Sequence, residues 1–382
     1  MDNSPLHSLL SQIKNYAAAS DCEGCFPEQE FELLRNASLL DVTLPEQAFS
    51  FEKRRTRDLL HFLKLIGKAS LPVGRIFEGH INALYLIHLF GTAEQQSRWY
   101  SDVTSDQKLF GVWNTEDKNG LLIHALGKGK FLLEGSKTFC SGAGWIERPL
   151  VTGRMASQTK NSWQMMVIPT EKVKKILSDG SFWKPLGMRA SASFRMDFTG
   201  VIIDQEDFLG PADAYYQQPY FTGGAVRFAA VQLGGAEAVL EETHAFLRSV
   251  KRTEDAFQRA RIAEIGFLVE TGNLWITQAA LKMDELHTTP AGINQLLAYV
   301  NMTRTMIEEI CLRCMQLSEK SVGSRGLMRP HALERIHRDL TTYLRQPAPD
   351  ATLTAIGEYI LSQESTSKIW EKVEVKKAEL VQ

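Results

Sequence analysis

Residues 109–154 read LFGVWNTEDKNGLLIHALGKGKFLLEGSKTFCSGAGWIERPLVTGR, and this stretch decides the fold class. It contains five short runs rich in β-forming residues, at 109–113, 121–126, 131–134, 138–141 and 149–154. Glycines and charged residues separate the runs, which is typical of strands joined by tight turns. The stretch therefore predicts a β module.

Helical patterns flank this β module on both sides. Apolar residues recur at helical spacing through much of residues 1–108, and long Ala-rich and Leu-rich runs fill residues 211–382. The sequence thus predicts an α+β multidomain protein. Its parts are an N-terminal helical domain at 1–108, a central β domain at 109–210 and a C-terminal helical domain at 211–382.

Composition narrows the class of protein. The 382 residues include 44% hydrophobic and 23% charged residues, which is ordinary for a globular protein with sizeable cores. The net charge of −2 suggests no nucleic-acid partner. No apolar run reaches the roughly 18 residues of a membrane span, and the N-terminus lacks the apolar block of a signal peptide. We therefore expect a cytoplasmic protein with no membrane partner.

Two CxxC pairs and two histidines are candidates for metal or acid–base chemistry. The pairs Cys22/Cys25 and Cys311/Cys314 lie far apart, and the second falls inside a helical run. We interpret both pairs as reduced, structural thiols and predict no metal site. His80 and His88 share an apolar helical stripe, where a histidine is more often a hydrogen-bonded core residue than a ligand or base.

Three motifs in order carry a resemblance to the acyl-CoA dehydrogenase superfamily of flavoproteins. The pair Thr115-Glu116 resembles the end of a strand beside the flavin, and Phe139-Cys140-Ser141-Gly142 resembles the aromatic-x-Thr/Ser-Gly signature of the next strand. The stretch KPLGMRASASFRMDFTGVIIDQEDFLG at 184–210 resembles a later loop and strand of the family. The resemblance runs from about residue 15 to about residue 345. It implies a central domain that is β-barrel-like and a C-terminal four-helix bundle.

The resemblance also implies FAD and a set of residues that bind it. Phe139 would form a wall for the flavin ring and Ser141 would offer its hydroxyl to the ring, while the 112–115 strand end would bond the ring's pyrimidine edge. Arg252 and the 320–326 segment resemble the parts that bind the pyrophosphate and adenine across a subunit interface. A homodimer or homotetramer is therefore expected. The cofactor-binding residues expected are Val112, Asn114, Thr115, Gly120, Phe139, Ser141, Arg252, Gly323 and Ser324.

The glutamate that serves as the family's catalytic base has no counterpart here. The usual position, counted from Asp339, falls on Pro347, and the alternative position on the long helix lies in 219–236, which contains no Asp or Glu. Glu364 stands in a similar motif but about 17 residues late. The catalytic residues thus remain unknown at this stage, with a polar C-terminal helix as the favoured interpretation of the Glu364 segment.

Three functions follow from these observations. The first is an FAD-dependent oxidoreductase of acyl-CoA dehydrogenase type, acting on a small-molecule substrate such as a CoA or carrier-protein thioester. The second is a flavin-dependent monooxygenase of the same fold, which uses reduced flavin and oxygen. Such relatives lack the glutamate and have segments similar to FCSG and GMRASAS here. The third is a non-catalytic flavoprotein. The resemblance to the acyl-CoA dehydrogenase superfamily favours the first function.

Overall fold

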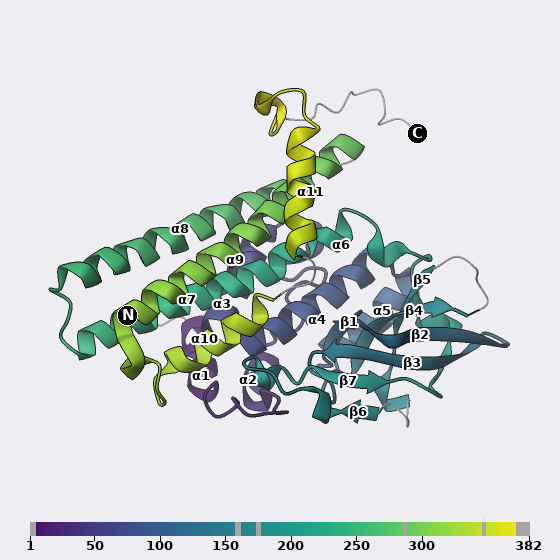
Figure 1. Cartoon of the computed structure of the whole chain (residues 1–382). Coiled ribbons are helices and arrows are strands. Elements are labelled where there is room, and N and C mark those ends of the chain that lie inside the picture. Colours follow the sequence, from purple (N-terminus) through teal and green to yellow (C-terminus); the bar gives the residue numbers. More distant parts are fainter. Residues whose placement is uncertain (1–4, 157–161, 173–176, 286–288, 346–348, 372–382) are drawn as a thin grey trace.

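The computed structural model describes residues 5–156, 162–172, 177–285, 289–345 and 349–371. Long helices occupy one side of the molecule and a β-sheet occupies the other (Figure 1). The N-terminal helices are α1 (Pro5–Tyr16), α2 (Glu28–Asn36), α3 (Thr56–Ala69), α4 (Leu71–Phe90) and α5 (Ala93–Thr104). The helix α4 is buried along most of its length and contacts β1, α3 and α7. It is the element that joins the helical part to the sheet.

The predicted strands form a single sheet within residues 110–209. They are β1 (Phe110–Trp113), β2 (Glu116–Gly127), β3 (Lys130–Cys140), β4 (Arg148–Met155), β5 (Trp163–Val167), β6 (Leu177–Asp179), β7 (Phe194–Asp197), β8 (Ile202–Asp204) and β9 (Phe208–Leu209). The main order is β6-β7-β3-β2-β4-β5-β9, with β1 on β4 and β8 on β3. Among the described strands, β6 and β9 lie at the two ends of this order and do not pair with each other, so the sheet is open. The expected barrel-like closure is not confirmed.

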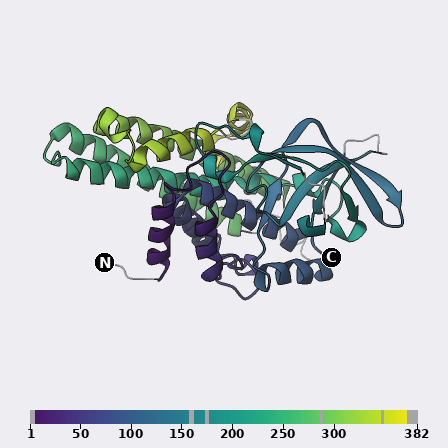
Figure 2. The ribbon, with the colours of Figure 1, turned by 90° about the horizontal axis from the view of Figure 1, so that it is seen from below.

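The C-terminal part returns to helix, as expected. Its helices are α6 (Tyr220–Gly223), α7 (Ala225–Ser249), α8 (Ala256–Asp284), α9 (Pro290–Gly326), α10 (Ala332–Tyr343) and α11 (Pro349–Leu361). The long helices α7, α8 and α9 run side by side in both views (Figures 1 and 2). The domain boundaries at 108 and 210 remain predictions.

The helix α7 also packs closely on α3, which ties the C-terminal helices to the N-terminal ones. A Cβ on Gly234 would lie 2.1 Å from the carbonyl oxygen of Lys64, and one on Gly67 would lie 2.3 Å from that of Val231. Two helix backbones approach this closely only where both side chains are absent. These glycines therefore set the distance between the two helical parts.

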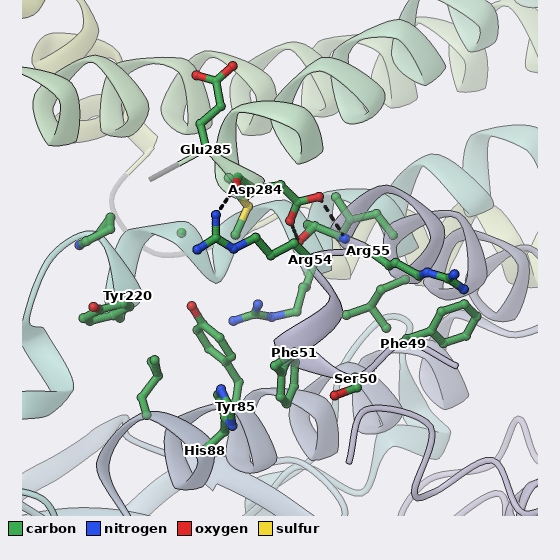
Figure 3. A pocket seen from close by; sticks show the side chains of 18 of the residues that line it. Phe49, Ser50, Phe51, Arg54, Arg55, Tyr85, His88, Tyr220, Asp284 and Glu285 are labelled. Atoms are coloured by element: carbon green, nitrogen blue, oxygen red, sulfur yellow. Dashed lines mark hydrogen bonds between the residues drawn. The ribbon is translucent and has the colours of Figure 1, made fainter. Parts of the chain in front are cut away.

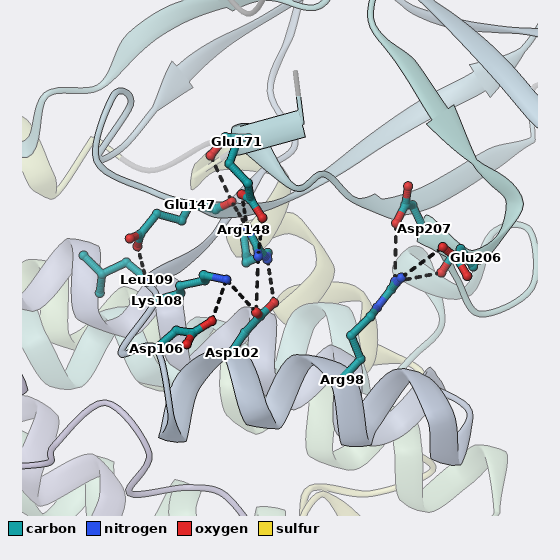
Figure 4. A network of polar contacts seen from close by, with 11 residues as sticks. Arg98, Asp102, Asp106, Lys108, Leu109, Glu147, Arg148, Glu171, Glu206 and Asp207 are labelled. Carbon is teal, nitrogen blue, oxygen red and sulfur yellow. Dashed lines mark hydrogen bonds and ion pairs between the residues drawn. The ribbon is translucent and has the colours of Figure 1, made fainter. Parts of the chain in front are cut away.

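Charged groups fix α5 against the sheet (Figure 4). Arg148 begins β4, and its guanidinium donates to both carboxylate oxygens of Asp102 on α5, at 2.6 and 3.2 Å. The same guanidinium donates to Glu171 Oε1 at 2.7 Å, and Lys108 Nζ pairs with Asp102 at 2.8 Å. Farther along α5, Arg98 pairs with Asp207 at 3.3 Å. Each side of this interface thus contributes a cation that pairs with a carboxylate of the other side.

His80 confirms the expectation of a hydrogen-bonded core histidine. It is fully buried, its Nδ1 accepts from the Phe110 backbone N–H at 3.1 Å, and its Nε2 lies 2.7 Å from the Leu40 carbonyl oxygen. These two contacts fix the neutral tautomer with its proton on Nε2. Burial lowers the pKa of His80 to about 4. The ring therefore links α4 to the start of β1 without carrying a charge.

The two CxxC pairs differ in their redox state. Cys311 and Cys314 are free and buried, as expected for structural thiols. Cys22 and Cys25 form a disulfide, so the prediction of reduced thiols is wrong for this pair. The loop between α1 and α2 brings the two sulfurs together. The described residues include no cluster of potential metal ligands, and none of the described helices could cross a lipid bilayer.

Candidate active site

A cavity of 440 Å³ lies where the ends of β1 and β3 face α4 and α10. Five of the nine predicted cofactor residues line it: Val112, Asn114, Thr115, Phe139 and Ser141. The helical side adds Arg75, Gly79, Asn82, Thr342 and Tyr343. The strand ends and the helices therefore meet at one hollow.

An aromatic corner forms one wall of the cavity. Phe139 is the second-last residue of β3 and has a positive φ of 53°, and the residue is 53% exposed despite its size. It meets Phe182 edge-on at 5.2 Å and Trp183 edge-on at 6.1 Å between ring centres. The Trp183 indole donates to the Arg189 carbonyl oxygen at 3.1 Å, which holds it in place. A large exposed aromatic face with fixed neighbours is suited to a flat ring.

Behind Phe139 lies a row of three serine hydroxyls. Ser141 Oγ is 2.9 Å from Ser193 Oγ, which is 2.8 Å from Ser191 Oγ. All three serines line the cavity. Hydroxyl groups both donate and accept, so this row can hold or pass a proton at the cavity wall. The GMRASAS segment indicated this loop, but the sequence did not single out Ser191 and Ser193.

Asn114 presents an amide to the same cavity. Its Oδ1 accepts from Thr152 Oγ1 at 2.6 Å and from Tyr216 at 3.3 Å. This leaves the Nδ2 donors without a partner among the described residues. The buried Lys137 fixes the same strand end, because its ammonium bonds the Asn114 carbonyl oxygen and the Glu116 carboxylate. Asn114 is thus held as a donor toward a ligand's acceptor edge.

The loop after Trp183 is fastened to α10. A Cβ on Gly187 would lie 2.0 Å from the Arg338 carbonyl oxygen, so only glycine fits there. The Met188 N–H donates to Asp339 at 2.6 Å, and Thr342 accepts from the Gly187 N–H at 2.9 Å. Burial raises the pKa of Asp339 to about 6. Asp339 therefore positions Met188, which lines the cavity, and has no role as a base at the cavity itself.

Two further cavities continue from the first. One of 490 Å³ shares Arg75, Asn82, Val112, Tyr215 and Phe221 with it, and is closed by Ala351, Thr352 and Ala355 of α11. The other, of 310 Å³, shares Tyr85, Tyr220 and Arg227 with the second (Figure 3). The helix α11 lies in the segment where the family resemblance ends, so this part of the site was not predicted.

His88 departs from the expectation of a core residue. It lines the third cavity beside Tyr85, and its ring lies 5.6 Å from that of Phe51. It is only half-buried, since it lies near the C-terminal end of α4, where the helix faces the hollow (Figure 3). Burial still lowers the pKa of His88, so the ring is largely neutral at pH 7.

The other four predicted cofactor residues lie outside these cavities. Gly120 sits at a bulge of β2, where a Cβ would lie 2.5 Å from the Glu116 carboxylate. Arg252 pairs with Asp255 at 2.6 Å in the turn between α7 and α8, at the end of the molecule opposite the sheet (Figure 1). Gly323 and Ser324 belong to the last turns of α9, with a kink at Gly323. Their assignment to the cofactor remains a prediction.

No base replaces the missing glutamate among the described residues that line the first two cavities. The single carboxylate there is Glu78, which is fully buried and bonded to both Arg75 and Asn82. Glu364 is 80% exposed and paired with Lys368. Pro347 lies outside the described residues.

Comparison with known proteins identifies the fold. The model of the acyl-CoA dehydrogenase N-terminal domain matches residues 9–107, and that of the C-terminal domain matches residues 214–344. A dibenzothiophene monooxygenase of Mycolicibacterium goodii is 21% identical over 90% of this chain and 89% of its own. A probable FMNH2-dependent monooxygenase of Pseudomonas putida, SfnC, is 23% identical over 93% of each chain. The crystal structure of TdsC from Paenibacillus sp. A11-2 with FMN and indole superposes with a TM-score of 0.82 at 20% identity, covering 93% of this chain and 95% of TdsC.

These findings correct the expected cofactor and substrate. The expectation of FAD is wrong: TdsC holds FMN, and the Pseudomonas relative is named for FMNH2. A CoA thioester likewise finds no support, since the ligand bound with FMN in TdsC is indole.

The broader predictions are confirmed. The relatives are enzymes, and they include flavin-dependent monooxygenases. The chain has N-terminal helices, a middle sheet and C-terminal helices in the order of its solved relative. The oligomeric state stays a prediction. With family matches on both sides of the sheet and this shared fold, the chain belongs to the acyl-CoA dehydrogenase superfamily of flavoproteins.

Proposed function

We propose that this protein is a monooxygenase that uses FMNH2 delivered by a separate reductase. The observation that carries the proposal is the lining of the first two cavities, in which the single described carboxylate, Glu78, is already bonded to Arg75 and Asn82. Dehydrogenation of an acyl thioester needs a free carboxylate to remove the α-proton. Oxygen transfer from reduced flavin has no such requirement.

The residues present fit the ring of a flavin in the 440 Å³ cavity. Phe139 and Trp183 would form an apolar wall, Asn114 Nδ2 would donate to the ring edge, and Ser141 would face it with a hydroxyl. FMNH2 would supply two electrons and two protons, so that one atom of O2 would enter the substrate and the other would leave as water. The serine row, Ser141, Ser193 and Ser191, would hold or pass a proton at the cavity wall. The aromatic corner would exclude bulk water.

A direct test combines cofactor binding with isotope transfer. Titration with FMN and FAD under the same conditions is expected to show tighter binding of FMN. With a flavin reductase, FMN and 18O2, a panel that includes indole and dibenzothiophene should yield a product carrying one labelled oxygen.

The competing dehydrogenase function is tested in the same preparation. Under anaerobic conditions butyryl-CoA should leave the bound, oxidised FMN unbleached. Rapid bleaching would overturn the proposal and restore the dehydrogenase. In that event, loss of bleaching in Glu364→Gln or in Glu78→Gln would identify the base.

A further inference from the structure

The arginine Arg227 stands in the wall that separates the second cavity from the third. It lies near the start of α7 and is only 5% exposed. The rest of residues 219–236 carries no charged side chain. A buried cation in so apolar a segment requires an explanation from its surroundings.

Its direct contacts give the guanidinium no carboxylate partner, and the nearby Glu78 acts on it only at longer range. The Nε–H donates to Asn82 Oδ1, and the guanidinium carbon lies 4.8 Å from the centre of the Tyr85 ring. Among the described residues no carboxylate lies within ion-pair distance of Arg227, whereas neighbouring Arg75 pairs with Glu78. Burial lowers the pKa of Arg227, but a guanidinium stays protonated at neutral pH.

The charged groups around the second cavity are mostly positive. Arg75, Arg227 and Arg304 line it against the single carboxylate Glu78. Much of the other lining is aromatic or small, from Tyr85, Tyr215, Tyr220, Phe221, Phe228, Ala351 and Ala355. Asp284 and Glu285 line the third cavity, on the far side of Arg227. An anion is therefore favoured on the side toward the second cavity, next to surfaces that suit a flat apolar body.

We propose that the substrate is an organic anion whose carboxylate, sulfinate or sulfonate group pairs with Arg227 in the second cavity. Its apolar body extends past Asn82 into the first cavity, since Asn82 lines both cavities and accepts from Arg227. The role as substrate rests on the proposed function. The anion site itself rests on Arg227 and the cavity.

The FMN phosphate is the other anion that an unpaired guanidinium could hold. The two possible anions, the flavin phosphate and the substrate, predict different binding. A site for the flavin phosphate would make Arg227 discriminate FMN from riboflavin. A site for the substrate would leave flavin affinity unchanged and make Arg227 discriminate charged from neutral ligands.

The experiment compares two probes of similar size, benzenesulfinate and neutral methyl phenyl sulfoxide, by calorimetric titration with and without FMN. The wild type should bind the anion at least about tenfold more tightly, as expected for a charge-assisted hydrogen bond. Arg227→Met should abolish this preference, while Arg227→Lys should retain part of it. The matched control Arg54→Met removes an arginine that lines only the third cavity, and should change the preference less than about twofold.

Three outcomes would overturn the proposal. They are equal binding of both probes by the wild type, an unchanged preference in Arg227→Met, and a loss of FMN over riboflavin discrimination in that variant. The comparison of the two probes on the wild-type protein tests the proposal even if Arg227→Met fails to fold. A protein that prefers the anion but takes up no flavin would refute the proposed function and leave the anion site standing.

Discussion

Arg148 and Arg227 are both buried arginines, 4% and 5% exposed, but their surroundings are opposite. Arg148 donates to two carboxylates, Asp102 and Glu171, at the junction of α5 and the sheet. Arg227 has an amide oxygen and an aromatic ring, and no carboxylate among the described residues. In the first arrangement the protein itself neutralises the arginine, and in the second the arginine is left to pair with a bound anion.

The comparison separates a structural cation from a functional one. A buried ion pair is strongly destabilised when one partner is removed, because the other charge stays behind. Removal of an unpaired buried charge leaves no such remainder. Mutation should therefore affect folding at Arg148 and ligand binding at Arg227.

The largest effect is expected for Arg148→Met. Glu171 would lose its cation, while Asp102 would keep Lys108. We expect a loss of about 3 kcal/mol in the free energy of unfolding, at the lower end for broken buried pairs. Urea denaturation measures it. The control is the double variant Arg148→Met/Asp102→Asn. Its loss in the free energy of unfolding should be less than the sum of the losses of the two single variants, because the pair acts as a unit. Strict additivity would show that the pair is not coupled.

A second prediction concerns His80, which joins the same two parts of the molecule without a charge. Its pKa of about 4 in the folded state lies below the ordinary value near 6.5, so the unfolded chain binds the proton more readily. The stability contributed is present above pH 6.5 and is lost as the pH falls toward 4. Between pH 7 and pH 5 the loss is about 2 kcal/mol.

The measurement for His80 is the slope of unfolding free energy against pH. The variant His80→Gln cannot titrate, and its amide can still donate to Leu40. Its stability should fall by about 2 kcal/mol less than that of the wild type over the same interval. Identical slopes would mean that His80 does not carry the acid sensitivity.

The sequence predicted residues within short motifs better than contacts between segments that are far apart in the chain. Val112, Asn114, Thr115, Phe139 and Ser141 were predicted because they lie within short motifs, at the ends of β1 and β3. Arg148 and Asp102 are 46 residues apart, and Arg227 and Asn82 are 145 apart, so only the fold reveals these contacts. One signal was present: Arg227 is the single charged residue in 219–236.

Two other predicted cofactor segments lie outside the cavities, in surroundings that a motif alone does not determine. Gly120 matches a cofactor glycine by position, yet its neighbourhood is the Glu116 carboxylate within β2. The 320–326 segment lies at the end of α9, where Gly323 leaves the helical conformation with φ 60° and ψ −168°. Its role at a cofactor stays a prediction.

A third prediction tests the neutral, polar wall of the first cavity. Ser141→Ala removes the hydroxyl that faces the proposed flavin and breaks the contact with Ser193. We expect FMN affinity to fall by about 1 to 2 kcal/mol, the range of a lost hydrogen bond in a partly buried site. Fluorescence quenching of FMN measures it. The matched control Ser105→Ala, on the exposed end of α5, should bind FMN as the wild type does.

The smallest effect on folding is expected for Arg227→Met, and it completes the comparison with Arg148. The variant loses one hydrogen bond to Asn82 and the contact with Tyr85, but it also removes the desolvation of an unpaired cation. Methionine keeps most of the side-chain volume against the aromatic walls. These contributions oppose one another, so the free energy of unfolding should change by less than about 1 kcal/mol in the absence of ligand. Urea denaturation beside Arg148→Met provides the measurement. A loss as large as that of Arg148→Met would mean that Arg227 is held by an anion within the protein, and the distinction between the two arginines would fail.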